Sequence, residues 1–120
     1  MKANELRIGN YVNIEGDVVK VKEIYEKSIH YANGEYEGYA TEDFIQPIEL
    51  TEEVLVRIWF KKIDNGIFRR KIGFYALIFN GVMLNIFDGV TGVLEIKCEY
   101  LHQLQNAYYC LTNEELEVKL

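Results

Sequence analysis

Residues 101 to 113, LHQLQNAYYCLTN, contain no charged side chain, although 27% of the residues in this 120-residue chain are charged. Apolar side chains recur at spacings of three and four in this stretch, which predicts a helix with one buried face. That buried face consists of Leu101, Leu104, Ala107, Tyr108 and Leu111. The rest of the chain must therefore form an apolar surface on which this helix packs.

The opposite side of the predicted helix carries uncharged polar groups, where a solvent-facing helix normally carries Lys and Glu. These groups follow the spacing i, i+3, i+4, i+7, and we call them the polar stripe: His102, Gln105, Asn106 and Tyr109. Such groups cost less to desolvate than ions do, so they suit a contact surface. Two interpretations follow: an exposed surface that binds a partner protein or a second copy of the chain, or a second packing face inside one domain.

The composition predicts a folded, cytoplasmic protein. Half of the residues are hydrophobic, with nine Tyr and six Phe, and this number of residues can bury an adequate core. No apolar run is long enough to span a membrane, and the start, MKANELRIG, lacks the apolar segment of a signal peptide. The net charge of −6 makes nucleic-acid binding unlikely, because phosphate contacts need a cationic surface.

The first 48 residues predict a small curled sheet or barrel. Short apolar segments separated by turns indicate strands at 11–14, 18–25, 28–32, 35–40 and 44–48. The dipeptide Asn33-Gly34 predicts a hairpin between the third and fourth strands.

The opening segment, LRIGNYVNIEGDVVKVKEI, resembles the first hairpin of SH3-like barrels of the KOW and Tudor kind. This resemblance implies that peptide or nucleic acid binds through clustered aromatic side chains. The candidates are Tyr11, Tyr25, Tyr31, Tyr36 and Tyr39. The same residues also fit ordinary packing between strands.

Residues 49–120 predict a helix, an antiparallel meander and the C-terminal helix. Thr51 is a good N-cap for a helix over 52–62, and we expect Trp59 to pack in the core. The strand at 74–79 is apolar on both faces, so we expect it at the sheet centre and covered on both sides. Alternating residues near the end predict a short terminal strand. The fold is therefore expected to be α+β and β-rich, with 1–48 and 49–120 sharing one core in a single domain.

The sequence contains no recognisable catalytic, cofactor-binding or metal-binding set. Cys98, His102 and Cys110 match no common zinc spacing, and a helical wheel separates His102 from Cys110. The basic run Arg69-Arg70-Lys71 would alternate between the two faces of a strand, which splits it. We expect no enzyme activity and no cofactor.

Three segments in order, ELRIGNYV, PIELTEEVL and YLHQLQNAYYCLTNEELEV, resemble a family of small uncharacterised proteins. These are encoded by bacteriophages and mobile elements of Bacteroides-like bacteria. In that family the position of Asn113 is commonly glycine, and Asn also tolerates the left-handed conformation of a helix end.

The resemblance implies an accessory protein of a phage or mobile element, with no established activity. The leading hypothesis is a non-enzymatic protein-binding module, in one version an inhibitor whose acidic surface occupies a groove of a host protein. The alternatives are an SH3-like module that binds nucleic acid or peptide, and a virion or assembly component.

Overall fold

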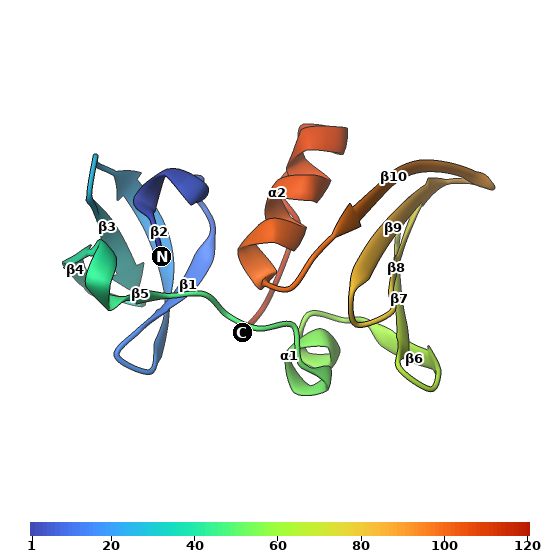
Figure 1. Cartoon of the computed structure of the whole chain (residues 1–120), viewed down its shortest axis with the longest axis horizontal. Helices are drawn as coiled ribbons and strands as arrows, with labels where there is room; N and C mark the ends of the chain where they lie inside the picture. The colour runs from blue at the N-terminus through green and yellow to red at the C-terminus, as the bar shows by residue number, and fades with distance from the viewer. The chain divides into compact units, whose positions relative to one another are not determined.

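Alternating apolar and polar residues, separated by short turns, produce four antiparallel strands in sequence order, and a fifth strand crosses over to pair with the first. In the computed structural model, which describes residues 1–120, the sheet order is β4-β3-β2-β1-β5 (Figure 1). The strands are β1 (Tyr11–Ile14), β2 (Asp17–Ile24), β3 (Ser28–Asn33), β4 (Tyr36–Thr41) and β5 (Ile45–Gln46). Two 3₁₀ turns, η1 (Ala3–Glu5) and η2 (Glu42–Phe44), precede β1 and β5.

This sheet is curled but does not close into a barrel, because β4 and β5 remain as its two edges. Strand β5 is only two residues long and pairs with Asn13 and Ile14 of β1. The edge of β1 before Asn13 therefore has no strand partner. The hairpin predicted at Asn33-Gly34 is confirmed, with Asn33 paired to Tyr36.

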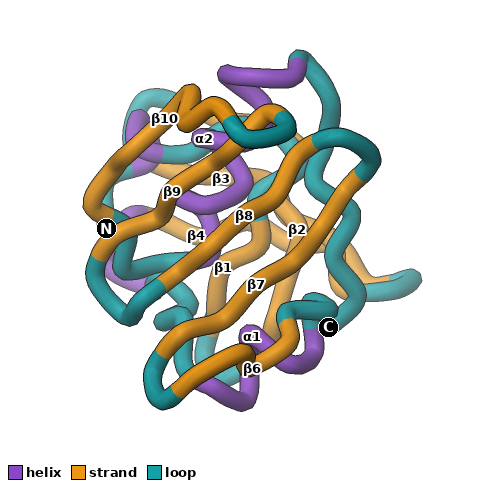
Figure 2. Tube along the Cα trace, turned by 90° about the vertical axis from the view of Figure 1, so that its right-hand side faces the viewer, coloured by secondary structure: helices purple, strands orange, loops and turns teal.

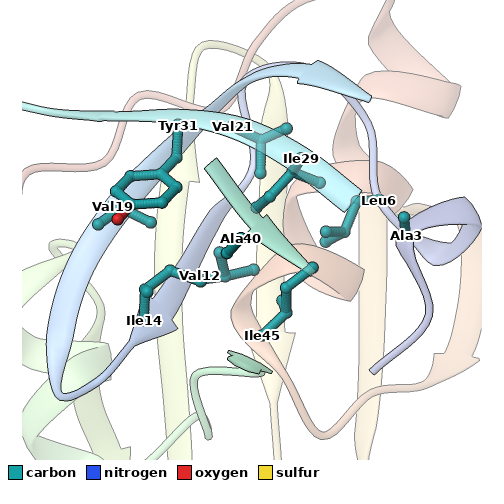
Figure 3. Close-up of a cluster of buried hydrophobic side chains, with 10 residues drawn as sticks. All are labelled: Ala3, Leu6, Val12, Ile14, Val19, Val21, Ile29, Tyr31, Ala40 and Ile45. Atoms are coloured by element: carbon teal, nitrogen blue, oxygen red, sulfur yellow. The ribbon is translucent and has the colours of Figure 1, made fainter. Parts of the chain in front are cut away.

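One face of this sheet forms the core of the first part of the chain. Figure 3 shows the buried cluster, with Tyr31, Val19 and Ile14 on one side of it and Ala3 and Leu6 on the other. Burial alternates along β1 and β3, as one buried face requires. The alternation of apolar and polar residues thus determines which side chains lie inside.

The C-terminal helix α2 (Leu101–Thr112) belongs to the same compact unit as this sheet. The first unit comprises Met1–Ile48 and Tyr100–Glu115, whereas the sequence grouped the helix with residues 49–120. A side chain of α2 hydrogen-bonds to the backbone at Tyr11 and Gly9, and the apolar face of the helix is buried. The helix ends at Asn113, whose φ of 59° is the left-handed conformation expected there.

The second unit comprises Glu49–Glu99 and Leu116–Leu120. It contains α1 (Glu52–Arg57) and a second antiparallel sheet of order β10-β9-β8-β7-β6, whose strands lie side by side in Figure 2. The strands are β6 (Lys61–Asp64), β7 (Ile67–Ile72), β8 (Tyr75–Phe79), β9 (Met83–Asp88) and β10 (Thr91–Lys97). The expected α+β, β-rich class is confirmed, and neither helix is long and apolar enough to span a bilayer.

Helix α1 is shorter than the predicted helix over 52–62. Thr51 caps it as expected, accepting a hydrogen bond from the Val54 N–H, but the chain leaves the helix at Ile58. Trp59 then adopts a φ of 69°, which is costly for a bulky residue. Trp59 is 46% exposed, so the expectation of a core tryptophan is wrong. The guanidinium of Arg70 lies 5.0 Å from the centre of its ring.

Strand β8 lies at the centre of the second sheet, as predicted, but only one of its faces is fully covered. Leu77 and Phe79 are buried, whereas Ala76 and Ile78 on the other face are partly exposed. The predicted terminal strand does not form, because the chain after Asn113 has no strand pairing.

Candidate functional site

Two of the four residues in the polar stripe of α2 are buried in the first unit, and the other two are partly exposed. His102 and Gln105 are 5% and 1% exposed, and Asn106 and Tyr109 are partly buried. The expectation of an exposed stripe is therefore wrong for His102 and Gln105. All four residues instead form the second packing face that was the alternative interpretation.

Gln105 takes the place of a missing strand beside β1. Its Oε1 accepts a hydrogen bond from the Tyr11 N–H at 3.0 Å, and its Nε2 donates to the Gly9 carbonyl at 3.2 Å. The Tyr11 N–H is at the start of β1 and the Gly9 carbonyl lies just before it, whereas β5 pairs only with Asn13 and Ile14. A side-chain amide offers one acceptor and two donors, so a single residue satisfies both groups.

Asn106 and Tyr109 hold the segment that leads into β1. Asn106 Oδ1 accepts from Asn10 Nδ2 at 2.8 Å and from Arg7 Nε at 3.3 Å. The Arg7 guanidinium lies 4.0 Å from the centre of the Tyr109 ring and is paired with Glu115. These contacts fix α2 to the start of the chain, so Asn106 and Tyr109 stabilise the fold of the first unit.

His102 is buried, and its Nδ1 has no hydrogen-bond partner. Its ring stacks on that of Tyr100, with the ring centres 5.9 Å apart. Burial lowers the pKa of His102 below its ordinary 6.5, and the carboxylate of Glu5 opposes this effect only in part. The residue has the character of a neutral packing group.

The charge of the chain is divided unequally between the two units. The first unit contains 5 basic and 11 acidic residues, whereas the second contains 8 of each. The whole net charge of −6 therefore belongs to the first unit. A surface of one sign attracts partners of the other sign and repels partners of the same sign.

A pocket of about 290 Å³ opens in this acidic unit, between the β1–β2 turn, the end of β4 and η2. It is lined by Ile14, Glu15, Tyr31, Tyr39, Ala40, Thr41 and Phe44. This volume is at the lower end of the range for ligand pockets, so it fits one side chain rather than a large cofactor.

The pocket combines aromatic rings with nearby carboxylates. Tyr31 is almost buried, while Phe44 is 55% exposed and Tyr36, whose ring centre lies 6.4 Å from that of Tyr31, is 64% exposed. Burial raises the pKa of Tyr31, and Tyr36, Glu15 and Asp17 raise it further. The carboxylates thus make the potential at the Tyr31 hydroxyl more negative.

The backbone at Gly38 allows Tyr31 to lie in this position. Gly38 is paired with Tyr31 across the strands, and a Cβ on Gly38 would lie 2.7 Å from the Tyr31 hydroxyl oxygen. Any larger residue would push the ring away. The position of the Tyr31 ring therefore depends on this glycine.

Glu15 occupies a turn position that disfavours its side chain. Glu15 and Gly16 connect Ile14 to Asp17 with φ values of 51° and 89°, which is the two-residue turn that favours Asn-Gly. A left-handed conformation costs most L-residues roughly 1–2 kcal/mol, and Asn less than Glu. A carboxylate is thus held beside the pocket at an energetic cost.

A separate cluster of polar and aromatic side chains, around His30, lies on the other face of the same sheet. His30 Nδ1 lies 2.9 Å from Glu23 Oε1, and its Nε2 lies 3.3 Å from Glu37 Oε1. The Tyr39 ring stacks on the His30 ring, with centres 4.8 Å apart, and Tyr25 lies next to Tyr39. The five candidate tyrosines therefore do not form one cluster, since Tyr31 and Tyr36 pair separately.

The remaining candidates are separated by the fold. Arg69 and Lys71 are exposed, whereas Arg70 points to the other face and donates to the carbonyls of Ile58 and Glu117. Cys98 is buried and Cys110 exposed. No three His, Cys, Asp or Glu side chains are placed to hold a metal ion.

No protein-family model, curated protein or solved structure gives a significant match to this chain. Sequence reasoning missed the pocket, whose lining residues come from strands and turns that are distant in the chain. The one available signal was the Glu-Gly turn, where the preferred residue is Asn.

Proposed function

We propose that this chain is a non-enzymatic protein-binding module that acts in the cytoplasm as an accessory factor of a bacteriophage or mobile element. The observation that carries the proposal is the concentration of the entire net charge on the first unit. The phage context rests on the resemblance of the three sequence segments described above. The partner surface is proposed to be the first unit, and the polar stripe has no part in it.

The charge favours a basic partner, such as a host protein whose own groove is cationic. Complementary charge raises the association rate and excludes acidic surfaces. Exposed aromatic side chains on the same unit, Tyr25, Tyr36, Tyr39 and Phe44, supply contact area of the type that is common in protein interfaces.

The test is affinity capture from a lysate of a Bacteroides-like host, at about 0.1 M and about 1 M salt, where screening lengths are about 10 and 3 Å. Capture should give one defined protein with a basic surface, retained at low salt and reduced at high salt. The test variant has Glu35 and Glu37 replaced by Gln, which lowers the acidity of the first unit, and the wild-type chain is its control. Equal capture by this variant would contradict a charge-guided interface.

The alternative is an SH3-like module that reads nucleic acid or peptide, which the exposed tyrosines favour because bases stack on aromatic rings. A fluorescence titration with single- and double-stranded DNA and RNA separates the two functions. Salt-sensitive binding at micromolar protein would support the alternative and count against the protein-binding module.

A further inference from the structure

We propose that the pocket of the first unit binds the cationic side chain, arginine or lysine, of a basic segment on the partner protein. This inference rests on the proposed function and identifies the part of the surface that recognises the partner. It concerns the lining of Glu15, Tyr31, Thr41 and Phe44, none of which is part of the polar stripe.

The lining has the two features that bind an organic cation. The faces of aromatic rings attract guanidinium and ammonium groups, and the pocket lining includes Tyr31 of β3, which is 9% exposed, and Phe44 of η2, which is 55% exposed. Glu15 lines the same pocket and brings a carboxylate to it. A cation in the pocket would gain both interactions, whereas an anion would meet only repulsion.

The strained turn supports a binding role for Glu15. Asn at this position would stabilise the turn, yet the chain has Glu with a φ of 51°. Residues held in unfavourable conformations cluster at sites of function, where a specific side chain is required in a fixed place. The requirement here is a carboxylate beside aromatic rings.

The charge distribution determines the kind of occupant. The unit that contains the pocket has a net charge of −6, so a neutral or acidic segment gains nothing from it. A basic segment with one side chain in the pocket would place its other charges near the surrounding acids. The extended acidic surface and the pocket would then act together.

The experiment is an NMR titration of the whole ¹⁵N-labelled chain with an acetylated, amidated Gly/Ser heptapeptide that has one central arginine. The peptide is added to about 10 mM, so that millimolar binding is detected. The matched ligand has citrulline in place of arginine, which keeps the shape and removes the charge. Saturable shifts should be confined to the amides of the pocket residues, and citrulline should bind at least about tenfold more weakly.

The decisive variant is Glu15→Asn, because it should improve the turn and weaken binding together. We expect an unchanged or higher melting temperature and binding of the arginine peptide weaker by up to about fivefold, the upper limit for one exposed charge pair. Phe44→Ala should weaken binding to a similar extent. The control is Glu26→Gln, which removes the same charge from an exposed turn outside the pocket and should leave binding unchanged.

Three results would refute the proposal that the pocket binds a cationic side chain. The first is the absence of saturable shifts, and the second is equal weakening by Glu15→Asn and Glu26→Gln, which would indicate diffuse charge attraction. The third is a set of pocket shifts on dilution of the free protein, which would show that a second copy of the chain occupies the site. The first two leave the affinity-capture experiment unaffected, so failure of the pocket is distinguishable from failure of the protein-binding function.

Discussion

Replacing Gln105 with Glu tests whether one side chain takes the place of a strand beside β1. The substitution keeps the size and shape of the side chain. Oε1 can still accept from the Tyr11 N–H, but the donor to the Gly9 carbonyl is lost unless the new carboxyl is protonated. The site is 1% exposed, so the ionised form is strongly disfavoured.

Proton linkage sets the magnitude of the effect. The folded-state pKa of the introduced carboxyl rises above the unfolded value of about 4.3, so the folded state holds the proton at higher pH and stability falls as pH rises. Each pH unit above about 4.3 costs up to about 1.36 kcal/mol, which gives a ceiling of about 3.7 kcal/mol at pH 7. Towards pH 4 the protonated carboxyl restores both hydrogen bonds, and the loss disappears.

The assay is urea unfolding of wild type and Gln105→Glu at several pH values, followed by circular dichroism, with the wild-type curve subtracted at each pH. The matched control is Gln46→Glu on the exposed edge strand β5, which should change stability by less than about 0.5 kcal/mol at every pH. A variant as stable as wild type at pH 7 would refute the reasoning. A loss that persists unchanged at low pH would refute it as well.

Three further predictions concern other parts of the fold. Wild-type stability should fall as the pH drops below about 6.5. Burial lowers the pKa of His102, so the imidazole gains a proton in the unfolded state at a higher pH than in the folded state. The variant His102→Phe should remove this component of the pH dependence. Gly38→Ala should destabilise the first unit by about 1–3 kcal/mol in urea unfolding, because its Cβ meets the Tyr31 hydroxyl. Trp59, the only tryptophan, lies in the second unit, and eight of the nine tyrosines lie in the first. If the two units share one core as a single domain, Trp59 fluorescence and the near-ultraviolet signal of the tyrosines should change at the same urea concentration. Separate transitions would contradict the single domain.

Local chemistry determined most of the secondary structure of this chain. The Asn33-Gly34 dipeptide, the alternation along β1 to β4 and the Thr51 cap each act within a few residues, so the sequence predicted them correctly. The predictions were wrong where residues distant in the chain determine the local conformation. Helix α1 ends at Arg57, before Trp59 adopts a conformation that is unfavourable for a bulky residue, and the last residues have no strand with which to pair.

The polar stripe shows where the sequence alone stops being informative. The helical period placed His102, Gln105, Asn106 and Tyr109 on one face and showed that the face is uncharged. It could not show what covers that face, because the answer depends on the length of β5, a strand far away in the chain. Since β5 ends after two residues, the Tyr11 N–H and the Gly9 carbonyl lack a strand partner, and the amide of Gln105 supplies one. Buried backbone groups must be paired, and only the tertiary structure decides which side chain pairs them.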